Sequence, residues 1–285
     1  MLAVIGGSGI YDLDESGTSE TITLETPFGS PSGPIREAKI GETDVLFLAR
    51  HGAGHVYSPT SVPYRANVFA LKSLGATHVL SLSSVGSLRE ELSPRTLVIP
   101  DQIIDRTVSR ERTFFESGVV AHVGIADPFC SHLRDALAEA ADLARCGVRV
   151  DGTYVCIEGP QFSTRAESNL FRLWGASVIG MTAMPEARLA REAGLCYAML
   201  AMVTDYDVWH DSEEDVSVEV VASNLQANSE AARAIVVQLA GSGLPERICG
   251  CKLALQHAIM TEEDQIPLEA QRWMRILAGD LQGTD

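Results

Sequence analysis

Short apolar runs are spaced along the chain in a pattern that predicts a buried β-sheet. Each run is rich in β-branched or other apolar residues and is bounded by turn-forming residues, as is typical of strands inside a sheet. The runs are Leu2–Ile5, Val45–Ala49, His78–Leu82, Leu97–Ile99, Tyr154–Ile157, Ser177–Ile179 and Tyr197–Val203.

Helical periodicity separates several of these predicted strands. In Pro63–Leu74, Ser131–Arg145 and Val218–Leu239, apolar residues recur every three or four positions and so form one apolar face. Strands that alternate with amphipathic helices are typical of an α/β protein. We therefore predict a mixed central β-sheet flanked by helices.

The domain organisation is predicted to be simple. The sequence has no internal repeat or long linker, and the Pro/Gly-rich stretch Thr26–Pro34 is followed too soon by another strand to be a domain boundary. Length alone leaves one or two domains open. We expect one domain over residues 1–285, with a C-terminal helical tail from about residue 241 that packs on the body or on a neighbouring subunit. Helices are predicted in this tail at Cys251–Met260 and Leu268–Leu277.

The charge balance narrows the classes of partner. The chain carries 22 Lys and Arg against 38 Asp and Glu, which gives a formal net charge of −16. Such an acid excess disfavours nucleic acids and anionic membranes. The apolar runs are shorter than the roughly 20 residues that a membrane crossing needs, and no secretory signal pattern follows Met1. We expect a cytoplasmic protein, in which a few local cations and backbone N–H groups could still bind a small anion.

Three of the predicted strands end in groups that suit phosphate. Gly6–Gly9 follows the first strand and could form either a tight turn or an anion-binding loop. It is not the glycine motif of a dinucleotide-binding fold, because the third glycine position of that motif is Asp12 here. Arg50 and His51 follow the second strand, and the third strand ends in the hydroxyl-rich run Ser81–Ser87. Each feature alone could be an ordinary loop. Because ligands of α/β sheets bind at strand ends, the three together favour a phosphate site.

Two later strand ends carry further candidates. A helix is predicted to begin after the fourth strand, with Ser163 or Thr164 as its N-cap. The last apolar run ends in Asp205 and Asp207. Two carboxylates spaced in this way could share a face and bind one edge of a flat ligand, or could cap the following turn.

The cysteines give a weak signal. Six cysteines are too few for a disulfide scaffold, and most lie in apolar or helical contexts where cysteine acts as a small apolar residue. Cys249 and Cys251 form a C-x-C pair, which could be structural, redox-active or inert. Because no second Cys or His cluster is near in the sequence, we predict no metal site. The remaining cysteines are Cys130, Cys146, Cys156 and Cys196.

Ordered sequence blocks then give a specific resemblance. The chain, from residue 1 to about 240, resembles the 5′-methylthioadenosine phosphorylases, which belong to the trimeric purine nucleoside phosphorylases. The blocks that carry the resemblance are Gly6–Gly9, Thr26–Gly29, Arg50–Gly52, Gly86–Glu91, Asp101–Thr107, Glu158–Ser163, Met181–Thr182 and Thr204–Asp207.

The resemblance implies a reaction and an assembly. Such enzymes cleave the N-glycosidic bond of 5′-methylthioadenosine with inorganic phosphate, giving adenine and 5-methylthioribose 1-phosphate. It implies no cofactor, phosphate as a co-substrate, a nucleoside as the other small-molecule partner, and a homotrimer with active sites near subunit interfaces. Alternatives are a broader purine nucleoside phosphorylase, a methylthioinosine or 5′-deoxyadenosine phosphorylase, a nucleoside hydrolase and a non-catalytic nucleoside-binding protein.

The resemblance also implies site residues. Phosphate would be bound by Ser8, Arg50, His51, Ser83, Ser84 and Thr182. The base and ribose would be bound by Phe162, Ser163, Met181, Asp205 and Asp207. The pocket for the 5′-substituent would be formed by Val218 and Val221 and by His122 from a neighbouring subunit.

Catalysis would depend on the two aspartates. Cleavage builds negative charge on the base, so we expect Asp205 to donate a proton to N7 if its pKa is raised, and Asp207 to bind the 6-amino group. Two departures bear on substrate range, because Gly180 replaces a common Asn and Ala222 replaces a common Leu. Both are expected to enlarge or loosen the site.

Overall fold

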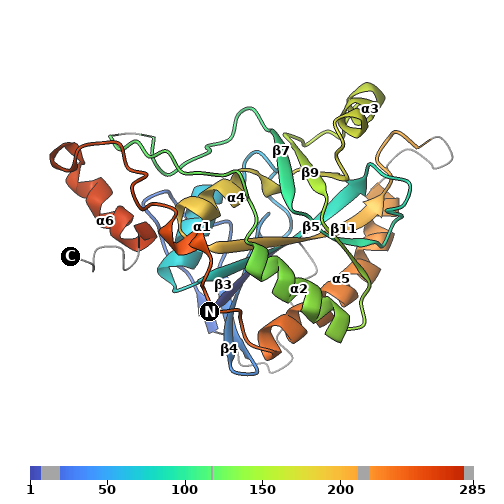
Figure 1. Cartoon of the computed structure of the whole chain (residues 1–285), viewed down its shortest axis with the longest axis horizontal. Helices are drawn as coiled ribbons and strands as arrows, with labels where there is room; N and C mark the ends of the chain where they lie inside the picture. The colour runs from blue at the N-terminus through green and yellow to red at the C-terminus, as the bar shows by residue number, and fades with distance from the viewer. Residues whose placement is uncertain (8–19, 117, 211–217, 279–285) are drawn as a thin grey trace.

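A mixed eleven-stranded sheet forms the centre of the molecule (Figure 1). The computed structural model describes residues 1–7, 20–116, 118–210 and 218–278. The strands are β1 (Leu2–Gly6), β2 (Glu20–Ile22), β3 (Ile35–Ile40), β4 (Thr43–Ala49), β5 (His78–Ser87), β6 (Leu97–Ile99), β7 (Gln102–Arg106), β8 (Val148–Val150), β9 (Thr153–Ile157), β10 (Val178–Gly180) and β11 (Cys196–Asp205). The helices are α1 (Tyr64–Ser73), α2 (Ser131–Leu143), α3 (Arg165–Leu173), α4 (Ala183–Glu192), α5 (Val218–Gly241) and α6 (Leu268–Ala278), with 3₁₀ turns η2 (Gly250–Leu253) and η3 (Glu263–Gln265).

Four parallel strands position the candidate site. β1 pairs in parallel with β4 and β5, and β5 pairs in parallel with β11 along nearly its whole length. The carboxyl ends of these strands therefore meet at one edge of the sheet. β10 runs antiparallel to β5 and brings the start of α4 to the same place. The prediction of an α/β fold with a mixed sheet is confirmed.

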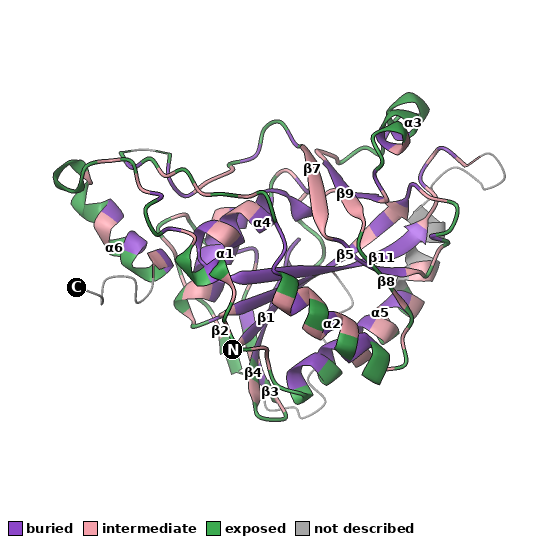
Figure 2. Ribbon diagram, in the orientation of Figure 1, coloured by how far each residue is buried: buried purple, intermediate pink, exposed green. Residues whose placement is uncertain are grey.

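Helices cover both faces of the sheet. α2 and α5 pack side by side on one face, where Leu137 and Leu239 are buried against strand residues (Figure 1). α1, α4 and α6 contribute to the apolar core on the other face, through residues such as Leu71 and Leu189. β5 and β11 lie between these layers and are almost entirely buried (Figure 2). Among the described residues, no helix is both long enough and apolar enough to span a membrane.

The C-terminal tail differs from its prediction in one segment. The predicted helix Leu268–Leu277 is present as α6, but the predicted helix Cys251–Met260 is wrong, because only the short turn η2 forms there. His257 has a φ of 61°, and the next residues pair with another segment, with Ile259 bridged to Ala121. These backbone groups bond across the molecule, and so they cannot close helical turns.

Candidate active site

A cavity of about 350 Å³ opens at the carboxyl ends of the parallel strands. Most of the residues that the sequence proposed for the site line it. These are Arg50, His51, Ser83, Ser84, Phe162, Met181, Thr182, Asp205 and Asp207. The volume lies in the range of small-molecule sites. The hydroxyl and cationic groups come from β4, β5 and the start of α4, and the two aspartates come from the end of β11.

The remaining candidates are not brought to this cavity. Ser163 is buried and does not line it, and its Oγ has no hydrogen-bond partner among the described residues. His122 is exposed, and its backbone N–H donates to Ala258 O at 2.8 Å. Three candidates lie outside what the structure describes, namely Ser8 and the side chains of Val218 and Val221, and so does the side chain of Ala222.

Arg50 is a buried cation at the phosphate-suited end of the cavity. It is 1% exposed, and its Nε donates to Glu186 Oε2 at 2.9 Å. Its Nη2 donates to Ser81 Oγ at 2.7 Å. Nη1 carries two N–H groups and donates to Leu82 O at 3.1 Å, so one N–H can still meet an oxygen in the cavity. The guanidinium is thereby fixed in place before any anion binds.

His51 stands beside this cation in its neutral form. Burial, followed by the charge of Arg50, lowers the pKa of His51 to about 4. Its Nδ1 lies 2.9 Å from Tyr57 O, and since a carbonyl only accepts, the proton is assigned to Nδ1. Nε2 is then an acceptor that suits a protonated phosphate oxygen or a ribose hydroxyl. His55 also lines the cavity and stacks on His51, with ring centroids 4.2 Å apart.

Hydroxyl groups continue the polar surface from β5 to α4. Ser83 Oγ and Thr182 Oγ1 are 3.0 Å apart, and the backbone N–H of Thr182 donates to Tyr154 Oη at 3.4 Å. Tyr154 occupies the space beside Gly180, where an added Cβ would lie 2.0 Å from the phenol oxygen. The expectation that Gly180 enlarges the site is therefore wrong, because Tyr154 fills that space.

The two aspartates lie at the other end of the cavity. Burial raises the pKa of Asp205, although its carboxylate accepts from Thr204 Oγ1 at 2.6 Å and from the Asp207 N–H at 2.8 Å. The Thr204 hydroxyl also lies 3.2 Å from Val85 O. It can therefore turn its single proton to that carbonyl when Asp205 is protonated.

Asp207 is the second carboxyl group of the pair. Burial, together with the nearby charge of Asp205, raises the pKa of Asp207 to about 6, although the nearby hydroxyl of Ser168 favours the ionised form. Asp207 Oδ2 is buried without a hydrogen bond among the described residues, and so is Ser168 Oγ. Asp207 has a φ of 52°, a conformation that aspartate adopts more readily than most residues. The backbone thus turns sharply after β11 and aims a second carboxylate at the cavity.

Apolar groups form the wall between the two polar ends. Met181 packs its sulfur over Gly159, where a Cβ would lie only 2.6 Å from it. Phe162 lines the cavity and is 49% exposed, so a flat ligand could cover its ring. Phe162 is held just before α3, which Thr164 caps by accepting from Glu167 N–H. The predicted cap at this helix is confirmed for Thr164.

Sequence reasoning missed two groups that support the site. Glu186 is 1% exposed and holds Arg50, and it accepts a hydrogen bond from Tyr197 Oη at 3.0 Å. A carboxylate among the apolar residues of α4 was the available signal. Arg110 donates to Met181 O at 2.6 Å and so fixes the wall. Arg110 lies in a polar loop segment, where no pattern distinguishes it.

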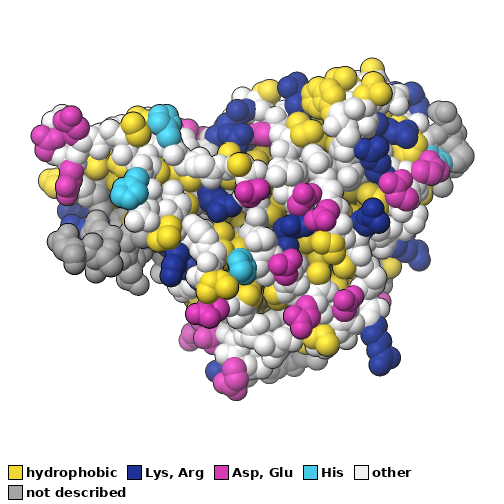
Figure 3. Space-filling view, viewed as in Figure 1, with side chains coloured by type: hydrophobic (Ala, Val, Ile, Leu, Met, Phe, Trp, Pro, Cys, Tyr) yellow, Lys and Arg dark blue, Asp and Glu magenta, His cyan; other side chains and the backbone are white. Residues whose placement is uncertain are grey.

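The charges on the molecular surface are distributed differently from those in the cavity. On the face shown in Figure 3, acidic and basic side chains are interspersed. The cation suited to phosphate is instead buried inside the cavity.

Comparisons with known proteins agree with this arrangement. A family model described as "Phosphorylase superfamily" matches residues 1–240. The S-methyl-5′-thioadenosine phosphorylase of Geobacter sulfurreducens is 47% identical over 280 residues, which cover 98% of this chain and 98% of that protein. The protein of the same name from Cereibacter sphaeroides is 50% identical over 264 residues, covering 92% and 91%.

The solved structures that this chain resembles are also methylthioadenosine phosphorylases. A methylthioadenosine phosphorylase from an antarctic soil metagenomic library superposes with a TM-score of 0.90 at 45% identity, covering 97% of this chain and 98% of that one. The methylthioadenosine phosphorylase of Schistosoma mansoni in complex with adenine has a TM-score of 0.81 at 38% identity, covering 85% and 91%.

Proposed function

Because the chain belongs to the phosphorylase superfamily and, within it, to the S-methyl-5′-thioadenosine phosphorylases, we propose that it cleaves 5′-methylthioadenosine with inorganic phosphate. The products are adenine and 5-methylthioribose 1-phosphate. The observation that carries this proposal is the cavity itself, which has a buried cation and hydroxyls at one end and two carboxyl groups of raised pKa at the other.

Phosphate would bind at the end that contains Arg50. Arg50 supplies charge, and Ser83, Ser84 and Thr182 supply hydroxyl donors around the anion. Nε2 of His51 would accept a hydrogen bond from a protonated phosphate oxygen. Ser8 completes this set in the proposal. A phosphate oxygen then attacks C1′ of the ribose, and the bond from C1′ to N9 breaks with its electron pair moving to the base.

The departing base would be bound by the two aspartates. Asp205, whose pKa is raised by burial, donates a proton to N7 and so neutralises the charge that develops on the purine. Asp207, with a pKa of about 6, is mostly ionised at neutral pH, and its carboxylate accepts from the 6-amino group. A 6-oxo base would bring a carbonyl oxygen to that carboxylate instead.

The sugar and its 5′-substituent would lie along the apolar wall. Met181 would lie against the ribose, and Phe162 and Ser163 would contact the purine. His122 lies outside the cavity of its own chain, and we propose that it enters the 5′-pocket of a neighbouring subunit in a homotrimer. Val218 and Val221 complete that pocket in the proposal.

Three wider properties belong to the same proposal. Residues 1–285 would form one domain, the enzyme would be cytoplasmic, and it would need no cofactor. An acidic chain whose cation lies inside a small cavity suits a nucleoside and phosphate as partners rather than a nucleic-acid polymer or a membrane.

An assay of free-base release tests the function. Purified protein would be given methylthioadenosine, adenosine, inosine and methylthioinosine, each with and without phosphate. We expect phosphate-dependent release of adenine, fastest from methylthioadenosine. Release without phosphate would indicate a hydrolase, and a preference for inosine or methylthioinosine would indicate a 6-oxopurine phosphorylase. Tight binding without turnover would identify a nucleoside-binding protein.

A further inference from the structure

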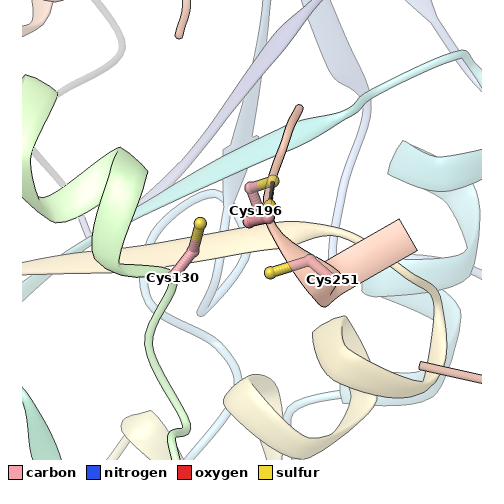
Figure 4. A group of neighbouring side chains, drawn as sticks. Cys130, Cys196 and Cys251 are labelled. Carbon is pink, nitrogen blue, oxygen red and sulfur yellow. Dashed lines mark hydrogen bonds between the residues drawn. The ribbon is translucent and has the colours of Figure 1, made fainter. Parts of the chain in front are cut away.

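Four cysteine side chains meet at the amino-terminal end of β11, the end opposite the cavity. Cys196 is the first residue of β11, Cys130 directly precedes α2, and Cys249 and Cys251 lie at the start of η2. Figure 4 shows Cys130, Cys196 and Cys251 coming together from these three elements. The segments are far apart in the sequence, and only the fold brings their thiols together.

The sulfur positions match the size of a mononuclear metal site. All four Sγ atoms lie within 4.8 Å of one another, and those of Cys196 and Cys249 are 3.4 Å apart. Zinc–sulfur bonds of about 2.3 Å place the sulfurs of a tetrahedron about 3.8 Å apart. Four sulfurs at this spacing leave room for one ion but not for a cluster of several iron atoms with their bridging sulfides.

We propose that these four cysteines bind one Zn²⁺ ion in a structural site. Tetrahedral sites of four thiolates favour zinc, which binds such ligands more tightly than ferrous iron does. The proposal replaces the expectation of no metal, which rested on the C-x-C pair alone. The fold adds Cys130 and Cys196 to that pair.

The surroundings of the cluster suit a closed metal site. Cys130, Cys196 and Cys251 are at most 3% exposed, and Cys249 is half-buried. Zinc with four thiolates carries two net negative charges, and Arg191 Nη1 donates to Cys251 Sγ at 3.5 Å. Cys130 also lies at the N-terminus of α2, where the helix dipole favours a thiolate.

Binding of a divalent cation would displace the thiol protons, because zinc binds cysteine as the thiolate.

Such an ion would fasten the C-terminal tail to the core. It would join the start of α2, the start of β11 and the segment after α5 in one set of bonds. Beyond η2 the tail pairs with residues 120–122, through Met260 N–H to Val120 O at 2.8 Å and the His122 N–H to Ala258 O. The zinc would thus hold the beginning of a segment whose later residues are held by backbone hydrogen bonds.

Metal analysis of the intact chain tests the site. The protein would be purified under reducing conditions in zinc-supplied buffer, and its metal content measured by mass spectrometry. We expect about one zinc per chain, and we expect a strong chelator to lower Tm by at least about 5 °C. Co²⁺ added to the stripped wild-type protein should give the absorption of a tetrahedral thiolate complex, a readout that needs no variant.

Matched variants make the test specific. The double variant C249S/C251S should lose the zinc. Cys146→Ser should keep it, because Cys146 is half-buried outside the cluster and its thiol faces Ala144 O at 3.6 Å. If wild-type protein purified in zinc-supplied buffer contains no metal and all four cysteines are free thiols, the proposal is wrong. Disulfides among these cysteines, seen as a loss of two hydrogens per bond in freshly isolated, metal-free protein, would overturn it in favour of a redox pair.

Discussion

The two ends of β11 hold opposite kinds of polar site. At its carboxyl end, Asp205 faces a cavity, and Asp207 Oδ2 has no partner among the described residues. At its amino end, Cys196 lies in a closed cluster whose sulfurs face one another. An open cavity can bind and release a substrate, whereas a closed set of thiols would hold a metal ion without exchange. On the two proposals above, one strand would separate a site for catalysis from a site for stability.

The largest expected effect comes from Asp205→Asn at the open end. Asparagine cannot donate a carboxyl proton to N7, so kcat/KM for methylthioadenosine should fall about 10²- to 10⁴-fold. Tm should not fall, because burial already disfavours the charge of Asp205. Steady-state kinetics and thermal unfolding measure both, and zinc content should equal that of the wild type. Retention of most of the kcat/KM would exclude Asp205 as the acid.

A second variant tests whether the open end is held by a buried ion pair. Arg50 and Glu186 have side chains that are each 2% exposed, so Glu186→Gln leaves a buried cation poorly compensated. We expect a loss of about 3 kcal/mol in the free energy of unfolding and a higher KM for phosphate. Denaturant unfolding and phosphate titrations measure these changes.

An exposed ion pair provides the control for this variant. Glu111 pairs with Arg65, but its side chain is 64% exposed, so Glu111→Gln should cost less than about 1 kcal/mol. Equal losses in the two variants would show that burial of the Arg50 pair is not what matters.

The sequence could predict the open end but not the closed one. Arg50 directly follows β4, Ser83 lies in the second half of β5, and Asp205 ends β11. The apolar runs of these strands mark where the polar residues begin, and parallel strands end at one edge of a sheet. The four thiols come from three distant segments, and nothing in the spacing of Cys249 and Cys251 indicates that Cys130 and Cys196 join them.

Packing contacts between distant segments could not be predicted from the sequence either. The role of Gly180 depends on where the Tyr154 ring lies, and the tail after η2 pairs across the molecule instead of forming a helix. Such contacts depend on three-dimensional neighbours. Local pattern fixes the strands and the amphipathic helices, but it does not fix these neighbours.

A third variant tests the tight packing beside the cavity. Gly180→Ala places a methyl group against the phenol of Tyr154, so the side chain or the strand must shift. We expect a loss of about 1–3 kcal/mol in the free energy of unfolding. We also expect reduced activity, because the cavity residues Met181 and Thr182 are the next two residues of the chain. Gly33→Ala is the control, since an added Cβ there has no neighbour within 4 Å. If both variants unfold like the wild type, the space beside Gly180 is open after all.

The smallest expected effect is a pH dependence that arises at the open end. The folded protein keeps His51 neutral, with a pKa of about 4 against an ordinary 6.5. Between these values the unfolded chain binds the proton more readily, so His51 makes stability fall as pH drops from about 6.5 towards 4. Asp207, with its pKa raised to about 6, acts in the opposite direction, because its folded form takes up a proton first.

Replacing His51 separates these two contributions. His51→Gln removes the histidine contribution, so the free energy of unfolding should decline less between pH 6.5 and 5 than it does in the wild type. His132, a half-buried histidine on α2 that does not line the cavity, provides the control, since His132→Gln should leave the decline unchanged. Denaturant unfolding at several pH values measures the slope. An unchanged slope in His51→Gln would mean that folding does not lower the pKa of His51, and the burial of its ring beside Arg50 would then not hold it neutral in weak acid.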